Sequence, residues 1–266
     1  MTTLARFRAA YADRREVEGR GSGGVAELLA LPYLRGGPLA RQWAVRARSY
    51  ARLLDAVVAP LARTVGPRPL RILDLGAGNG WLCYRLTLRG HRCLALDWRR
   101  DAVDGLGAGA AYAGHLPTAF LRVAASFEAI PLERGFDLVV FNAAVHYASS
   151  LDSTIAEAVR VTLPGGRIVI LDSPFYRRGT DGERMVAEKR ETALREWGDA
   201  AADLLALPMI EYLTADRLAQ ASAPHGLSWR RHPVRYPLWY ELRPLAARVR
   251  GRRPPSRFDV WEAVVP

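Results

Sequence analysis

Residues 72–80 decide the fold of this chain; they read Ile72-Leu73-Asp74-Leu75-Gly76-Ala77-Gly78-Asn79-Gly80. An apolar stretch ends there in a loop with glycine at every second position, and a helical stretch follows from Trp81. Glycine allows a sharp turn and a close approach of a ligand to the backbone. The free amide groups at a helix start favour an anionic or carbonyl-bearing ligand. The stretch therefore predicts a ligand-binding strand, loop and helix, and alone it fits a nicotinamide, flavin or nucleotide site.

The chain downstream of this loop alternates short apolar runs with helical stretches, which is typical of a parallel sheet with crossover helices. We expect the first strand at 71–75 and further strands at 92–96, 120–124, 136–141 and 167–171. Helices are expected at 81–89, 151–163, 181–207, 214–221 and 242–249. Two more strands, at 228–236 and 258–265, complete the set, and the last is expected to be antiparallel. The fold class is α/β, a doubly wound, mostly parallel seven-stranded sheet with helices on both faces.

The chain upstream of the loop, residues 1–69, is expected to form an N-terminal helical cap. Apolar residues recur there at spacings of three and four, which predicts an amphipathic helix, before Gly66-Pro67-Arg68-Pro69 breaks it. These residues are Leu39, Trp43, Ala47, Tyr50, Leu54, Val57 and Leu61. Residues 70–266 form the main domain, with a helical insertion expected at about 174–223.

The composition is that of a globular protein with a large core. The 266 residues are 50% hydrophobic and 24% charged, and the mean hydropathy is −0.06. No apolar run reaches the length of about 18 residues that a membrane span needs, and residues 1–12 lack the apolar core of a secretory signal. Cys83 and Cys93 make neither a disulfide framework nor a zinc site, so we expect no metal, two core cysteines and a cytoplasmic location.

The net charge of +11 makes the chain attractive to anionic partners. Lys189 is the single lysine, however, and the arginine bias is typical of a GC-rich genome. The basic residues are densest near the C-terminus, where nucleic-acid binding stays open as an alternative although we do not favour it. They are Arg230, Arg231, Arg235, Arg248, Arg250, Arg252 and Arg253.

Two features narrow the kind of ligand that the glycine loop binds. The pattern is Gly-x-Gly-x-Gly, and Trp81 stands where a dinucleotide-binding fold has its third glycine. Asp97 closes the second predicted strand, where a carboxylate accepts hydrogen bonds from a ribose 2′,3′-diol and repels a 2′-phosphate.

The chain from about Leu70 to Ser173 resembles the class I S-adenosylmethionine-dependent methyltransferases, because it has motifs similar to theirs in the same order. Asp74 to Gly80 is similar to their first motif, Asp97 to their ribose-binding residue and Ser126-Phe127 to their adenine motif. Residues 136–146 and 163–168 are similar to their fourth strand and the entry to their fifth. The resemblance implies S-adenosylmethionine as cofactor, bound by Asp74, Gly76, Ala77, Gly78, Asn79, Gly80, Asp97, Trp98, Ser126, Phe127 and Asn142.

Individual roles follow from the same resemblance. Ser126 stands where the family often has aspartate, and a hydroxyl accepts from the adenine amine more weakly than a carboxylate does. Trp98 either stacks on adenine or forms an apolar wall. Asp74 orients the methionine amino group or anchors the loop, and Asn142 ends the fourth strand beside the expected point of methyl transfer.

His146 is the candidate catalytic residue, as a base that takes a proton from the acceptor, with a structural histidine as the alternative. Tyr147, Asp172 and Tyr176 are candidates for the same rim. The chain lacks the Asn/Asp-Pro-Pro-aromatic run of adenine-amino methyltransferases and the nucleophilic cysteine of cytosine-C5 enzymes. We therefore expect methylation of a small-molecule acceptor. Oxygen is taken as the acceptor atom only because of how often such enzymes methylate oxygen.

The small-molecule pocket is expected between the sheet rim, the N-terminal helices and residues 175–212. The alternative is an RNA-directed methyltransferase or an RNA-binding protein that uses the C-terminal arginines. We expect no membrane partner, and the sequence gives no indication of oligomeric state.

Overall fold

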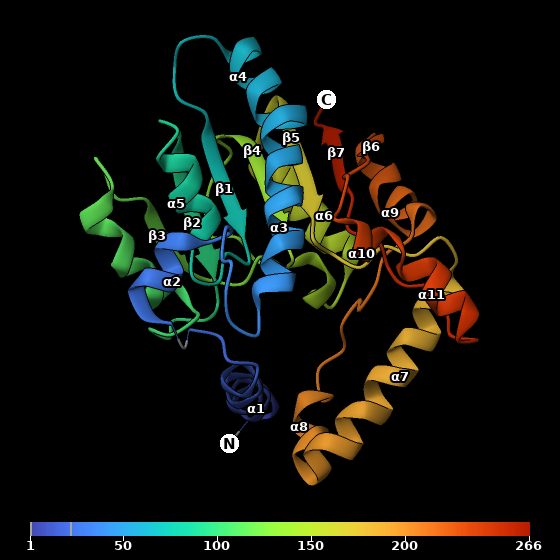
Figure 1. Ribbon diagram of the computed structural model, residues 1–266. Coiled ribbons are helices and arrows are strands. Elements are labelled where there is room, and N and C mark those ends of the chain that lie inside the picture. The colour runs from blue at the N-terminus through green and yellow to red at the C-terminus, as the bar shows by residue number, and fades with distance from the viewer. Residues whose placement is uncertain (1, 22) are drawn as a thin grey trace.

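A seven-stranded sheet organises the computed structural model, which describes residues 2–21 and 23–266 (Figure 1). Its order is β3-β2-β1-β4-β5-β7-β6, and β7 runs antiparallel to both of its neighbours. The predicted doubly wound sheet and its antiparallel final strand are confirmed. The strands are β1 (Arg71–Leu75), β2 (Arg92–Asp97), β3 (Leu121–Ala124), β4 (Phe136–Asn142), β5 (Thr162–Leu171), β6 (Trp229–His232) and β7 (Val260–Val264).

The centre of the sheet holds the point where the winding reverses. β1 pairs in parallel with β2 on one side and with β4 on the other. In open parallel sheets, ligands bind in the crevice outside the carboxyl ends of the strands at such a point. The glycine loop follows β1 directly, so it lies at this crevice.

Helices cover both faces of the sheet because successive side chains of a strand point to opposite faces. Ile72 joins the core on the face of the N-terminal helices, and Leu73 joins the core on the other face. The first face carries α2 (Gly24–Ala30), α3 (Ala40–Leu53), the π-helical turn η1 (Leu54–Val58), α4 (Ala59–Val65), α5 (Trp81–Thr87) and η2 (Leu106–His115). The second carries α6 (Leu151–Val161) and α9 (Ala215–Ser222).

Aromatic side chains fix α3 to the helix that follows the glycine loop. The rings of Trp43 and Tyr50 lie edge-on to Trp81, with centroid distances of 5.7 and 5.6 Å. Both are buried, as predicted. The predicted helix at 39–61 corresponds to α3, η1 and α4 together, which run on to Val65.

Three further helices lie beyond the carboxyl ends of the strands (Figure 1). They are α1 (Thr3–Val17), α7 (Gly179–Trp197) and α8 (Ala201–Leu204), with the short turn η4 (Gly198–Ala200) between the last two. The single helix expected at 181–207 is therefore wrong. Gly198 ends α7 with a φ of 51°, a left-handed conformation that glycine adopts without strain.

The C-terminal part departs from expectation in smaller ways. β6 stops at His232, immediately before Pro233, which has no amide to donate to the sheet. β5 starts at Thr162 rather than 167, with a register shift against β4 near Phe136. The helix expected at 242–249 is α11 (Arg243–Val249), and an additional short helix, α10 (Leu238–Glu241), precedes it. The remaining short turns are η3 (Val145–Tyr147) and η5 (Ala223–His225).

Neither a membrane-crossing helix nor a metal cluster occurs in the described part of the chain. Its helices are too short or too polar to span a bilayer, and its His, Cys, Asp and Glu side chains form no group that could hold a metal ion.

Candidate active site

The glycine loop turns tightly between the ends of β2 and β4. Gly76, Gly78 and Gly80 have φ values of 73°, 55° and 79°, which favour glycine. A Cβ at Gly76 would lie 2.4 Å from the Cβ of Ala144, so no side chain fits there. The amides of Gly76 and Ala77 donate to the carbonyl of Leu96, which fixes the loop to the end of β2.

Asp97 is held in one orientation at the end of β2. Its Oδ2 accepts from the amide of Gly78 and its Oδ1 from the amide of Arg99, each at 2.8 Å. Burial raises the pKa of this carboxyl, against the opposing effect of the two amides and of Arg99. The carboxylate is thereby fixed beside the glycine loop, where a ribose diol is expected.

A cavity of about 580 Å³ opens at this edge of the sheet, within the usual range for small-molecule sites. The glycine loop forms its floor and β2, the β3 end and the β4 end form its walls. The lining residues from these parts include Gly76, Ala77, Gly78, Asn79, Asp97, Trp98, Ser126, Phe127, Asn142, Ala143, His146, Tyr147, Asp172 and Pro174. The cavity therefore joins the predicted cofactor site to the rim of β4 and β5.

Helix α1 forms the roof of this cavity through Leu4, Phe7, Arg8, Tyr11 and Arg15. The Arg8 guanidinium lies 4.8 Å from the centre of the Trp98 ring. Tyr11 packs against Trp98 on one side and edge-on against Tyr147 on the other, with centroid distances of 6.2 and 5.9 Å. One helix thus covers both the cofactor end and the β4 end of the cavity.

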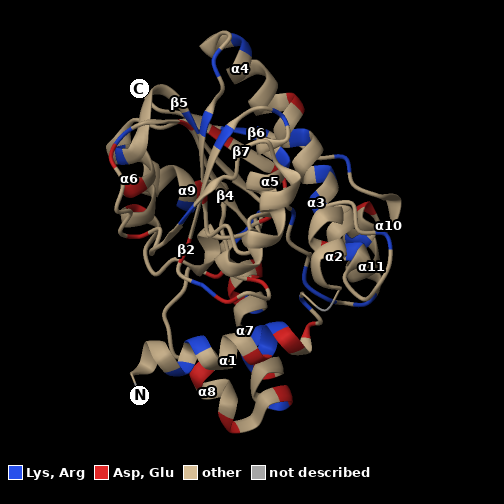
Figure 2. Cartoon of the chain, turned by 90° about the vertical axis from the view of Figure 1, so that its left-hand side faces the viewer, with Lys and Arg blue, Asp and Glu red and all other residues tan. Residues whose placement is uncertain are grey.

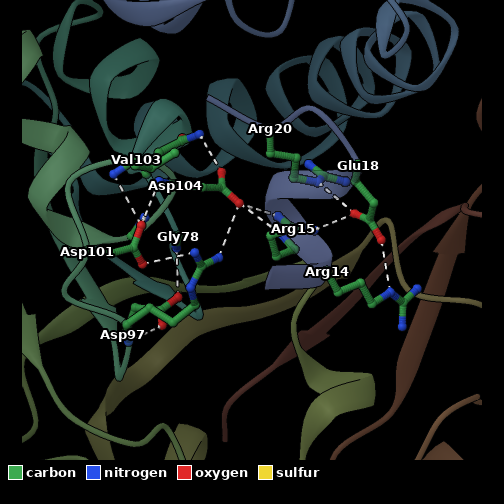
Figure 3. A network of polar contacts seen from close by, with 12 residues as sticks. Arg14, Arg15, Glu18, Arg20, Gly78, Asp97, Asp101, Val103 and Asp104 are labelled. Atoms are coloured by element: carbon green, nitrogen blue, oxygen red, sulfur yellow. Dashed lines mark hydrogen bonds and ion pairs between the residues drawn. The ribbon is translucent and has the colours of Figure 1, made fainter. Parts of the chain in front are cut away.

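Asp104 is the charged anchor of this roof (Figure 3). Its Oδ2 accepts from Arg15 Nε and Nη2 at 2.9 and 2.6 Å and from Arg99 Nη1 at 3.2 Å. Its Oδ1 accepts from Asn79 in the glycine loop at 3.1 Å. Burial opposes ionisation of Asp104, but Arg15, Arg20 and Arg99 hold its pKa below the usual value. The carboxylate therefore connects α1 directly to the cofactor loop.

His146 lies in η3, directly after β4, and lines the cavity. Its Nδ1 is 3.1 Å from the hydroxyl of Ser173. Burial, together with the positive charges of Lys189 and Arg46, lowers the pKa of His146 to about 3. The imidazole is therefore neutral throughout the physiological range.

The ends of β4 and β5 carry backbone strain beside His146. Ala143 and Asp172 have φ values of 56° and 53°, which are unusual for residues with a Cβ. Asp172 Oδ1 accepts from Ser49 at 2.5 Å, and its buried Oδ2 has no partner among the described residues. Burial raises the pKa of Asp172, against the effects of Arg46 and Ser49.

Most of the predicted site residues face this one cavity, but two do not line it. Asp74 lies buried behind the loop, where the Cys83 thiol points at its Oδ2 across 3.9 Å. Burial and the nearby Asp97 raise the pKa of Asp74 to about 8. Gly80 caps the start of α5. Their proposed contacts with cofactor, like those of the lining residues, stay predictions.

Of the three candidates for the rim, two line the cavity and one does not. Tyr147 and Asp172 line the cavity. Tyr176 lies outside it, and its hydroxyl accepts from Arg253 at 2.9 Å. Cys83 and Cys93 are buried free thiols, as expected for core positions.

The cavity lies against N-terminal helices and the segment Leu207 to Met209, as expected, but hydrophobic periodicity does not identify α1 as its roof. The α1 residues 3–17 show no amphipathic pattern, and their partners Trp98, Asp104 and Tyr147 lie far along the chain. Arg46 of α3 was also missed, although it lines the cavity. The recurrence of aromatic and arginine residues in α1 is the one local signal that pointed to a ligand-facing helix.

The C-terminal arginines do not form one patch. Arg231 pairs with Asp259 at 2.6 Å and Arg253 with Glu188 at 2.7 Å. Basic residues are spread over several helices and strands rather than gathered on one element (Figure 2). Two arginines of the alternative RNA-binding segment are therefore neutralised by acidic partners.

The residues present fit a nucleoside that carries an amino-acid tail. Asp97 offers a fixed carboxylate for a diol, and Trp98 and Phe127 offer apolar rings. Oδ1 of Asn142 is buried without a partner among the described residues, which leaves an acceptor for a ligand donor.

Fold, loop and acidic residue together define the site of a class I S-adenosylmethionine-dependent methyltransferase. The sequence profile of a family described as "Methyltransferase domain" matches residues 73–170, which hold the loop, Asp97 and β4. Residues 73–170 thus form a methyltransferase domain of the class I S-adenosylmethionine-dependent type, whose cofactor is S-adenosylmethionine.

Curated relatives are similar over this same region. A malonyl-[acyl-carrier protein] O-methyltransferase of Methylococcus capsulatus is 33% identical over 141 residues, 48% of this chain and 43% of that protein. A tRNA 5-carboxymethoxyuridine methyltransferase of Escherichia coli K12 is 31% identical over 124 residues, 46% and 45% of the two chains. The chain spans less than half the length of each of these two relatives.

Solved structures share the fold at low identity. Geranyl diphosphate C-methyltransferase from Streptomyces coelicolor has a TM-score of 0.59 at 13% identity, over 86% of this chain and 83% of that one. Magnesium protoporphyrin IX methyltransferase from Synechocystis, with bound cofactor, has a TM-score of 0.55 at 14% identity, over 96% and 97%. At such identities the likeness concerns the fold alone.

Proposed function

We propose that this protein transfers the methyl group of S-adenosylmethionine to a small-molecule acceptor, with oxygen as the expected acceptor atom. The observation that carries this proposal is the cavity roofed by α1, which joins Asp97 and the glycine loop to the His146 rim. A covered cavity of this size suits a small ligand. The curated relatives support transfer to oxygen, because one of them is an O-methyltransferase of a malonyl group.

The cofactor would be held at the β1–β2 side of the cavity. Asp97 would take the ribose hydroxyls, Trp98 and Phe127 would enclose adenine, and Ser126 would accept from its amine. The backbone of Gly76 to Asn79 and Asn142 would hold the methionine end, with Asp74 supporting the loop from behind. When bound, the cofactor supplies a methyl group on a sulfonium, which is already an activated leaving group.

The chain's own contribution is mainly positioning and exclusion of water. Alignment of two reacting groups can supply about 7–11 kcal/mol of barrier reduction. Here α1 covers both ends of the cavity, and the ring of Tyr11 packs against those of Trp98 and Tyr147 along this roof. The acceptor would lie against β4 and β5, near Asn142 and Asp172.

His146 would accept the proton that a hydroxyl acceptor loses. When Nδ1 donates its hydrogen to Ser173, Nε2 carries the free lone pair. A positioned base adds roughly 10²–10⁴-fold to a rate. Burial, Lys189 and Arg46 make an imidazolium costly, so the proton would move to His146 only as the arriving methyl group makes the acceptor oxygen positive and its proton acidic.

An RNA acceptor is the second candidate. One curated relative acts on tRNA, and Arg248, Arg250 and Arg252 form no salt bridge with a described acidic residue. Filter binding distinguishes the two: tight RNA association that weakens steeply with salt would replace the small-molecule proposal.

Calorimetry with S-adenosylhomocysteine tests the cofactor site directly. We expect binding in the micromolar range, about −8 kcal/mol at a Kd near 1 μM. A radiolabelled methyl-transfer screen of small hydroxyl and carboxyl compounds then tests the activity. Absence of cofactor binding refutes the site, and binding without transfer to any compound or RNA refutes the catalytic proposal.

A further inference from the structure

A second cavity, of about 290 Å³, adjoins the active cavity between α3 and α10. Val45, Trp239, Tyr240 and Phe258 give it apolar and aromatic walls. Four residues line both cavities: Gln42, Arg46, Asp172 and Phe258. The second cavity is therefore an extension of the first on the side of β5, away from Asp97.

Arg46 stands at the junction of the two cavities with its charge unmatched. No hydrogen bond or ion pair to its guanidinium occurs among the described residues, and it lies 5.0 Å from the ring of Trp43. Burial and the nearby Arg20 lower the pKa of Arg46 to about 10, which Asp172 only partly offsets. Arg46 is still cationic at neutral pH, so it is a partly buried cation with no anionic partner in contact.

Apart from Asp172, the other charged residues that line this second cavity are also arginines. Arg243 donates Nη2 to the carbonyl of Ser256 at 2.6 Å and lies 3.9 Å from the ring centre of Tyr240. Its buried Nε has no partner in the described part of the chain. Arg41 lies over Trp239 at 5.9 Å. Three arginines thus line a space whose only acidic residue is Asp172.

We propose that this second cavity binds a carboxylate of the methyl acceptor, with Arg46 as its main partner and the aromatic walls holding an apolar body. Guanidinium groups form strong, paired hydrogen bonds with carboxylates, and a partly buried cation without a partner gains from the arrival of an anion. The proposal rests on the proposed function. It names the acceptor as an aryl or alkyl carboxylate whose reacting atom extends toward His146.

The location favours the acceptor over the cofactor as the source of the carboxylate. The cofactor end is marked by Asp97 at β2, whereas the second cavity begins at Asp172 beyond β5. Arg46 acts electrostatically on both Asp172 and His146, on the acceptor side of β4. A carboxylate at Arg46 would therefore lie beside the candidate base.

The test is a pair of probes of equal shape and different charge. Benzoate and benzamide are titrated into the complex with S-adenosylhomocysteine and followed by ligand-observed NMR. We expect benzoate to bind at least about tenfold more tightly than benzamide, as a charge-assisted contact implies. Arg46→Gln should remove that preference. Arg248→Gln, an exposed arginine outside both cavities, should leave it unchanged.

Three results overturn the proposal. One is equal binding of the two probes, and another is retention of the preference in Arg46→Gln. The third concerns the cofactor. If Arg46→Gln loses affinity for S-adenosylmethionine but keeps its affinity for decarboxylated S-adenosylmethionine, then Arg46 binds the carboxylate of the cofactor and not that of the acceptor. Retained S-adenosylhomocysteine binding shows that the variant is folded. A wild-type protein that does not bind S-adenosylhomocysteine refutes the proposed function instead.

Discussion

Replacing Arg15 with glutamine should loosen the roof of the active cavity. Arg15 and Asp104 form two short hydrogen bonds between α1 and the segment after β2, and their side chains are only 17% and 7% exposed. Hydrogen bonds to charged groups contribute about 1.5–3 kcal/mol. Arg99 and Asn79 still contact Asp104 in the variant, so we take about 2 kcal/mol as the loss.

A loss of that size should be visible in the opening of α1. The equilibrium between closed and open roof should shift about 30-fold, since 1.36 kcal/mol corresponds to a factor of ten. Hydrogen–deuterium exchange of peptides within Thr3–Val17 should accelerate by about this factor, because local opening sets the exchange rate. S-adenosylhomocysteine should also dissociate faster, while exchange in β1 and β4 should stay unchanged.

The same helix offers a matched control. Arg6 pairs with Asp203 at 3.2 Å, but the two side chains are 50% and 37% exposed. An exposed pair contributes about 0.2–1 kcal/mol, so Arg6→Gln should accelerate exchange by no more than about fivefold. If Arg15→Gln exchanges no faster than Arg6→Gln, then the aromatic contacts hold the roof and the Asp104 anchor does not.

Three further predictions concern the floor and the rim. Gly78→Val should weaken S-adenosylhomocysteine binding at least about tenfold by calorimetry, because φ at this position is 55° and the Gly78 amide holds Asp97. Gly66→Val is the control for backbone strain alone, because Gly66 has a φ of 89° and lies in open space. Burial holds the pKa of Asp74 at about 8, so the folded state keeps a proton that the unfolded state loses above about pH 4. The free energy of unfolding should therefore fall as pH rises from 4 to 8, by about 6 kcal/mol at most. Denaturant melts of Asp74→Asn should lose this dependence of the unfolding free energy on pH. An unchanged dependence in the variant would exclude Asp74 as its cause. His146→Ala should lower turnover about tenfold or more with little change in cofactor affinity, and its pKa of about 3 predicts no inflection from this residue between pH 5 and 8; normal turnover in the variant would make His146 structural.

The sheet and the cofactor loop could be predicted because their signals are local. A buried strand, alternate glycines and an acidic residue closing the next strand lie within 26 residues, from Ile72 to Asp97. β1 accordingly has the predicted ends, and β2 differs by one residue.

The sequence predicts that N-terminal helices border the active cavity. It does not predict which helix forms the roof or where the second cavity lies, because contacts between distant residues make both. Arg15 meets Asp104 across 89 positions, and Ser49 meets Asp172 across 123. Neither pair leaves a pattern in its own neighbourhood. The helix expected at 181–207 failed for a different reason: its apolar and polar residues suit a helix, but the left-handed backbone at Gly198 ends it.

The position of α1 has a consequence for the timing of a catalytic cycle. Phe7 and Arg8 lie over the cofactor end and Tyr11 over the rim of β4, on consecutive turns of one helix. Because these residues lie only about one turn apart, a movement of α1 that uncovers one end of the cavity also displaces its cover over the other. Both products would therefore escape through one shared event, and its frequency would set an upper limit to the number of cycles per second, whatever the speed of the bond-making step.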